Sequence, residues 1–149
     1  MKTILVLLLT FLGTMSAFCA QQIDAAKWRE VQTYDIPALQ KVQGTQIGKV
    51  VGVRINNRSK RISGRKPNWF ESSVWVRSPG EKQKFSFVRV MVAKKDLPSF
   101  KAIPTDFQSP AEIVVYGQVQ REPDANFLFI RLMGRNATVD AAGNATVDW

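Results

Sequence analysis

The strongest constraint on this 149-residue chain is a period of two in its apolar residues from Gly44 onward. Alternation of this kind is typical of β-strands, whose successive side chains point to opposite faces. β-Branched and aromatic residues gather in runs that turn-forming residues separate. We expect five strands, over residues 47–56, 69–77, 84–93, 112–121 and 126–133. The pattern therefore predicts a mainly all-β fold.

The connections between these runs follow a recognisable order. A long basic segment follows the first run, a turn at 78–81 joins the next two, Pro98 and Pro104 interrupt the crossover, and residues 122–125 form a hairpin turn. With the runs at 47–53, 113–119 and 127–130, this order resembles the OB-fold superfamily. The resemblance implies a small five-stranded Greek-key barrel with a short N-terminal helix and an irregular crossover between strands 3 and 4. Another small β-barrel or a β-sandwich is the alternative.

The first twenty residues have the features of an export signal. Lys2 precedes an apolar stretch at 4–12, which is too short to span a bilayer, and small residues follow up to Ala20. We expect residues 1–20 to be a signal peptide and the mature protein to be secreted or periplasmic, without a transmembrane segment. The rest divides into an N-terminal brace, an OB-like domain and a C-terminal tail, at 21–43, 44–135 and 136–149.

The brace and the tail carry local signals of their own. Asp24 is a plausible cap for a short helix. The tail contains the duplicated stretches 136–140 and 144–148, separated by three small residues. This repeat predicts either a small hairpin around Gly143 or a disordered end.

Cys19 is the only cysteine, and the chain has no histidine. A lipoprotein signal places cysteine directly at the cut after small residues, whereas Phe18 stands there, so lipid anchoring through Cys19 is disfavoured. Cleavage after Ala20 leaves no thiol or imidazole, which excludes most nucleophilic and transition-metal sites. Glycine-rich phosphate loops and Asp-x-Asp loops are also absent from the sequence. We expect no catalytic residue, metal or cofactor.

The chain is strongly basic, with a formal net charge of +9. Residues 49–66 hold seven of the Lys and Arg residues and no acid. A positive surface of this kind favours polyanionic partners, such as nucleic acid or acidic glycan, without selecting one.

We expect the ligand site to combine the loop between the first two strands with one face of the second and third strands. Aromatic rings stack on bases or sugars, and guanidinium groups pair with phosphate or sulfate. The candidate loop residues are Arg58, Lys60, Arg61, Arg65, Lys66 and Trp69, and the candidate face residues are Trp75, Arg77, Phe87 and Arg89.

Two functional interpretations remain open. The first is an exported, non-catalytic module that binds an extended anionic ligand, either single-stranded nucleic acid or acidic glycan. The second is a protein-interaction or envelope-structural module, in which the basic loop only protects a sheet edge. In that interpretation the brace covers Trp75 or Phe87 through Trp28 and Tyr34.

Overall fold

The computed structural model describes residues 20–55, 59–66, 69–77, 85–103, 113–124 and 126–149. The N-terminal part comprises β1 (Gln21–Ile23), α1 (Ala25–Arg29), β2 (Thr33–Asp35), α2 (Ile36–Val42) and a 3₁₀ turn (Gln43–Gln46). The central strands are β3 (Val50–Ile55), β4 (Ser59–Lys66), β5 (Trp69–Arg77) and β6 (Phe85–Ala93). A 3₁₀ turn (Lys94–Asp96), α3 (Leu97–Ala102), β7 (Ile113–Arg121), β8 (Leu128–Gly134), β9 (Asn136–Val139) and β10 (Ala145–Asp148) complete the described elements.

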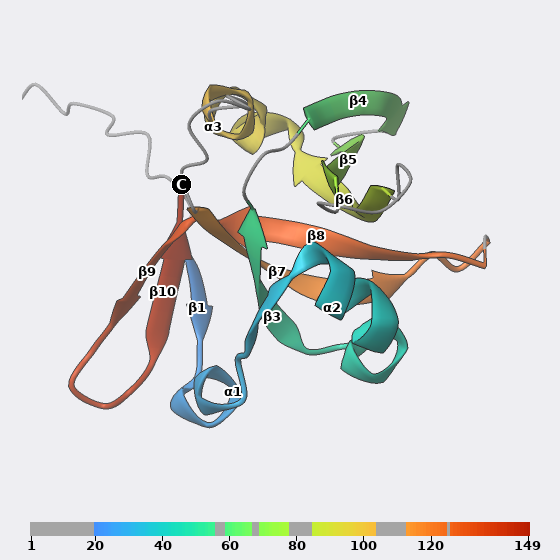
Figure 1. Cartoon of the computed structure of the whole chain (residues 1–149). Coiled ribbons are helices and arrows are strands. Elements are labelled where there is room, and N and C mark those ends of the chain that lie inside the picture. Colours follow the sequence, from blue (N-terminus) through green and yellow to red (C-terminus); the bar gives the residue numbers. More distant parts are fainter. Residues whose placement is uncertain (1–19, 56–58, 67–68, 78–84, 104–112, 125) are drawn as a thin grey trace, which may run out of the picture.

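Most strands belong to one seven-stranded sheet with the order β2-β3-β7-β8-β6-β5-β4 (Figure 1). The β2·β3 and β6·β8 pairs are parallel, and the other pairs are antiparallel. The expected all-β class is therefore confirmed. Within the described residues the sheet is not a closed barrel, because β2 and β4 each pair with a single neighbour in it.

All five expected strands are present, as β3, β5, β6, β7 and β8. The basic segment was wrongly expected to be a loop, because residues 59–66 form β4 and pair with β5 from Ser59↔Trp75 to Lys66↔Trp69. An edge strand has one side free of hydrogen-bonded partners, so it tolerates the charged residues that a central strand excludes. The basic residues thus lie on an ordered strand at the end of the sheet.

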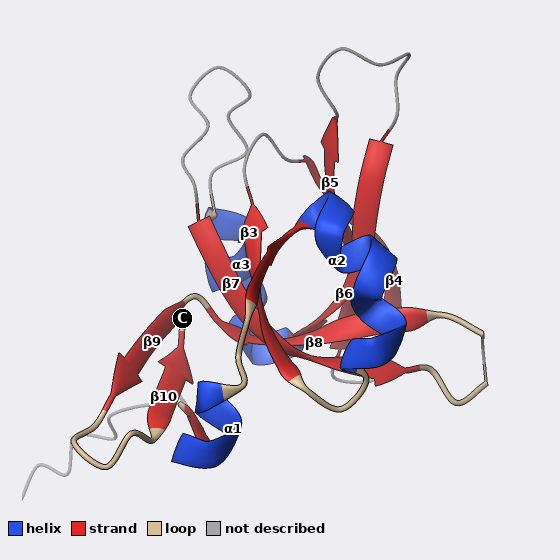
Figure 2. Cartoon of the chain, turned by 60° about the horizontal axis from the view of Figure 1, so that its bottom comes forward, coloured by secondary structure: helices blue, strands red, loops and turns tan. Residues whose placement is uncertain are grey.

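The main core lies on one face of this sheet. Val51, Val53 and Ile55 of β3 are each about 1% exposed, and the alternate residues of β6, β7 and β8 join them. Helix α2 contributes the buried Ile36 and Leu39 and packs against both β3 and β6, which are not neighbours in the sheet (Figure 2). Since α2 holds two separate strands together, this part of the expected brace is built into the core.

The crossover between β6 and β7 contains a 3₁₀ turn and then α3, in which Pro98 occupies the first turn. Proline fits there because the first turn of a helix has no intrahelical acceptor for its missing N–H. Phe100 of α3 is buried in the main core and meets the ring of Trp149 edge-on, with 6.3 Å between the ring centroids. The last residue of the chain is therefore packed against the same core.

A second, three-stranded sheet with the order β1-β10-β9 contains both ends of the described chain (Figure 1). The repeated tail folds as a hairpin, which decides between the two expectations for it. Asp140 closes the turn by accepting hydrogen bonds from the backbone of Ala142 and Asn144, each at 2.9 Å, and Gly143 supplies the positive φ of 88°.

The small sheet covers one end of the outer face of the large sheet, meaning the face turned away from the main core. Its cluster joins Ile23, Ala145 and Val147 to Met133 of β8, with Val50 and Tyr116 packed against it. Trp28 of α1 lies 5.5 Å from Tyr116, centroid to centroid. Tyr34 packs against the main core, and Phe87 is 45% exposed, so the brace does not cover Phe87 through Trp28 and Tyr34 as the second interpretation expected. The same expectation for the side chain of Trp75 lies outside the described part of the structure.

Asp24 caps α1 as expected, because its carboxylate accepts the backbone N–H of Lys27 at 2.9 Å. Among the helices in the described part of the chain, none is both long enough and apolar enough to cross a membrane.

Candidate functional site

The candidate residues fall on three neighbouring strands. Arg58 lies outside the described residues, and the backbone places Lys60, Arg61, Arg65 and Lys66 on β4. Trp75 of β5 pairs with Phe87 of β6, and Arg77 pairs with Phe85. Positions 75 and 87 are thus directly opposite each other, and position 77 is diagonal to position 87. Position 89 is diagonal to position 75, because Arg89 pairs with Ser73. Trp69 pairs with Ala93 at the opposite end of β5, so the structure does not bring it to the other four.

The outer face of β6 combines an exposed ring with a held cation. Val88 and Val90 are buried in the main core, so the alternate residues Phe87 and Arg89 lie on the outer face. Phe87 is 45% exposed. The guanidinium carbon of Arg89 lies 4.3 Å from the ring centroid of Phe127, in the connection between β7 and β8. This cation–π contact holds the planar guanidinium of Arg89 on the same face of β6 as the exposed ring of Phe87.

Farther along the outer face, three strands form a hollow that the sequence did not predict. The β6–β8 hollow has a volume of about 230 Å³ and is lined by Met91, Gln120, Phe129 and Arg131. Met91 and Phe129 are almost fully buried, whereas Arg131 is exposed. The site therefore combines apolar surface with an amide and a guanidinium group, which is a suitable lining for a flat, polar-edged ligand.

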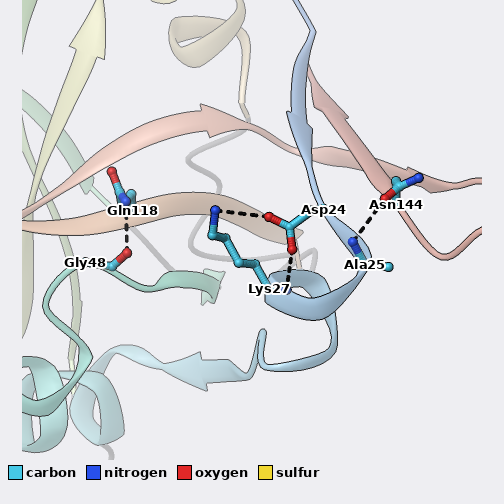
Figure 3. A network of polar contacts seen from close by, with 6 residues as sticks. All are labelled: Asp24, Ala25, Lys27, Gly48, Gln118 and Asn144. Atoms are coloured by element: carbon cyan, nitrogen blue, oxygen red, sulfur yellow. Dashed lines mark hydrogen bonds and ion pairs between the residues drawn. The ribbon is translucent and has the colours of Figure 1, made fainter.

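A chain of amide hydrogen bonds fixes the two glutamines of β7. Gln118 donates from Nε2 to the carbonyl oxygen of Gly48 at 2.9 Å, as Figure 3 shows. Gln120 in turn donates from Nε2 to Oε1 of Gln118 at 2.8 Å. Because a backbone carbonyl can only accept, the orientation of both amides is set, and Oε1 of Gln120 is the acceptor at the end of the chain.

A second hollow lies where the small sheet meets the large one. The inter-sheet hollow has a volume of about 240 Å³, and its polar lining includes Gln22, Asp24, Lys27, Gln118 and Arg131. Lys27 Nζ lies 3.0 Å from the Asp24 carboxylate, as Figure 3 shows. The backbone hydrogen bond from Lys27, followed by the side-chain bond, lowers the pKa of Asp24. Arg131 lines both hollows.

The sequence carried a weak signal for these residues. Gln118, Gln120 and Arg131 occupy the non-core positions of strands that were correctly expected, where any exposed polar residue is ordinary. Only the register, which pairs Gln118 with Arg131 and Gln120 with Phe129, brings them together. Within the described ranges, no group of three Asp, Glu, His or Cys residues could hold a metal ion.

Comparisons with known proteins identify no family for this chain. No protein-family model matches it, and no curated protein matches it. Among solved structures it is similar to a "putative nucleic acid-binding lipoprotein" from Klebsiella pneumoniae subsp. pneumoniae MGH 78578. The two chains are 19% identical and superpose with a TM-score of 0.42, over 69% of this chain and 89% of the other. A likeness at this level carries neither a fold nor a function over to this chain.

Proposed function

We propose that this protein is an exported, non-catalytic module that binds an extended anionic ligand, with single-stranded nucleic acid as the preferred class. The observation that carries the proposal is the exposed Phe87 beside Arg89, one strand from β5 and two strands from the basic β4. Rings and cations at adjacent register positions suit a ligand that alternates flat groups with phosphates.

The topology supports an OB-like arrangement for the binding sheet. The five expected strands follow one another in space as β3-β7-β8-β6-β5, so that the last of them lies between the third and the fourth. This is a Greek-key order, and β4 extends it at the edge beside β5. In folds of this class, the outer face of the second and third strands holds extended ligands, which corresponds to β5 and β6 here.

Single-stranded nucleic acid fits this surface better than an acidic glycan does. The face offers aromatic positions at Trp75 and Phe87, and every nucleobase has two flat surfaces for stacking. Hydrogen-bonding amides lie on β7, two strands from β6. A glycan would use the cations and leave most of this aromatic capacity unused.

The export part of the proposal concerns residues 1–20. Strand β1 begins at Gln21, so cleavage after Ala20 would leave every described element intact. A lipid on Cys19 would leave one residue before β1. Mass spectrometry of the native protein should give a mature chain that begins at Gln21 without an attached lipid, and a diacylated Cys19 would overturn this part.

The binding proposal is tested with the mature protein and a fluorescent oligothymidylate. With about six phosphate contacts, the logarithm of the association constant should fall with the logarithm of salt concentration with a slope of roughly −4, because single strands release about 0.7 counterion per contact. The same titrations with heparin identify a glycan-binding protein. An association constant that does not change with salt concentration, or absence of binding to oligothymidylate, would contradict the proposal and favour a protein-interaction module.

The contribution of the ring is tested by Phe87→Ala. Stacking is worth about 1–3 kcal/mol per base, so affinity should fall roughly fivefold to 150-fold. Ile47→Ala is the matched control, because Ile47 is 41% exposed and precedes β3, which is three strands from β6 in the sheet. Equal affinities of the two variants would remove Phe87 from the site.

A further inference from the structure

We propose that the bound single strand continues from Phe87 across β8 and β7, that Arg131 holds one of its phosphates, and that the small sheet ends the path. This inference rests on the proposed function and deepens it. The first half of the site is the part on β5 and β6 around Phe87 and Arg89. The inference adds a second half on β8 and β7, where no candidate residue was expected.

The register places the second half in a row across the sheet. Met91 of β6 pairs with Arg131 of β8, Arg131 pairs with Gln118 of β7, and Gln118 pairs with Val50 of β3. All four positions lie on the outer face, since the residues on either side of Arg131 are in the main core. With about 4.8 Å between strands, the row spans about 14 Å.

This row begins at Met91 of β6, the strand that also carries Phe87 and Arg89. Phe87 and Met91 are four positions apart on β6, which is about 13 Å at the rise of a strand. Arg89 lies between them and contacts Phe127, the residue just before the strand that carries Arg131. The path therefore runs along β6 and then turns across β8 and β7.

The chemistry of the β6–β8 hollow fits one nucleotide. Its volume of about 230 Å³ is below the roughly 300–1,000 Å³ of sites for larger ligands. Met91 and Phe129 offer apolar contact to the flat face of a base, and Oε1 of Gln120 offers an acceptor to its edge. Arg131 is an exposed residue that lines the hollow, and a guanidinium group suits a phosphate.

The small sheet stands at the far end of the row. The inter-sheet hollow shares Arg131 and Gln118 with the path, but its opposite wall carries the Asp24 carboxylate, paired with Lys27 at 3.0 Å. Because the two charges of this pair offset each other, the wall offers no net attraction to a phosphate, and the small sheet limits the path.

The experiment compares affinities for oligothymidylates of about 4 to 16 nucleotides, the range of site sizes for such folds. Three variants of the mature protein are used: Arg131→Ala, Arg135→Ala and Phe87→Ala. Arg135 is the matched control because it is exposed, four residues away, and lines neither hollow, while its removal changes the net charge equally. Gln120→Ala provides a second test of the row.

Wild-type affinity should rise with length until both halves are filled. Arg131→Ala should bind the shortest oligomers as Arg135→Ala does and lose about tenfold for the longest, with the salt slope smaller by about 1. Gln120→Ala should show the same length dependence with a smaller loss, and Phe87→Ala should weaken binding at every length. Arg135→Ala should match the wild type apart from a small loss shared by all lengths.

Two outcomes separate the two proposals. If Arg131→Ala and Gln120→Ala match Arg135→Ala at every length while Phe87→Ala loses affinity, the proposed function stands and the second half of the site is wrong. If the wild type binds no oligomer at any length, both proposals fail. Thermal unfolding of each variant shows whether a loss comes from the site or from the fold, and Gln120→Ala still tests the row if Arg131→Ala does not fold.

Discussion

The outer face of the large sheet has a covered half beneath the small sheet and an open half beyond it. At one end of the outer face, Tyr116 and Met133 are covered by the small sheet, and two residues farther along the same strands Gln118 and Arg131 line open hollows. The change from apolar to polar side chains takes two residues along β7 and two along β8, which is the next position on the same face. It marks where packing between the sheets stops and where a surface available to a ligand begins.

The covered half should respond most strongly to a buried charge. Val147 has no exposed surface, so Val147→Asp places a carboxylate in the cluster between the sheets and should cost roughly 3–5 kcal/mol of unfolding free energy. Urea unfolding measures the loss. Thr138→Asp, at an exposed position of the same sheet, is the control, and equal stability of the two variants would mean that the small sheet is not packed as described.

At the boundary between the covered and open halves, β7 and β8 are in close contact. The stability of the protein should be almost as sensitive to added side-chain volume there. A Cβ at Gly117 would lie 2.5 Å from Cγ2 of Ile130 and 2.6 Å from the carbonyl oxygen of Arg131. Gly117→Ala should therefore destabilise the protein by about 1–3 kcal/mol and disturb the β6–β8 hollow. Gly44→Ala, where a Cβ meets nothing within 4 Å, should be neutral or slightly stabilising. Equal melting temperatures of the two variants would contradict the close contact of β7 and β8.

The open half should show a smaller, pairwise effect. Arg89 and Phe127 form a cation–π contact, which is worth about 0.5–1 kcal/mol at exposed sites. A double-mutant cycle with Arg89→Gln and Phe127→Leu should give a coupling of that size in the unfolding free energy. Additive effects of the two substitutions would show that the pair does not interact in solution.

The smallest expected effect is the acid dependence of stability at the two ends of the small sheet. Hydrogen bonds from Lys27 lower the pKa of Asp24, and those from Asn144 lower the pKa of Asp140, both below the ordinary value of 3.8. A lowered folded-state pKa means that the stabilisation is present above the unfolded value and is lost as the pH falls through the folded value. The double variant Asp24→Asn, Asp140→Asn should therefore flatten the decline of the urea midpoint below pH 3.8. An unchanged decline would contradict it.

The sequence predicted the strands better than their environment. Period-two alternation located β3, β6, β7 and β8 because each has one face in the main core, and it also located β5. It missed β4, since Lys60, Arg61 and Arg65 give no apolar alternation, and only pairing with β5 makes this segment a strand. It also missed β1 and β2, because three-residue strands are too short to show a period.

The candidate site was predicted in part for a similar reason. Phe87 and Arg89 were found because a ring and a cation stand on the non-core side of one strand. Arg131, Gln118 and Gln120 come from two strands joined across the sheet, and their proximity depends on the β7·β8 register. A register is a property of paired strands, so single-strand patterns do not contain it.

The central claim is that the open half of the outer face binds a single nucleic-acid strand. The most direct test is NMR mapping of the backbone amides of the mature protein on addition of an oligothymidylate. The account predicts perturbations at Phe87, Arg89, Gln120 and Arg131, and none along β9. Perturbations centred on the small sheet, or none at concentrations where the oligomer is in excess, would contradict it.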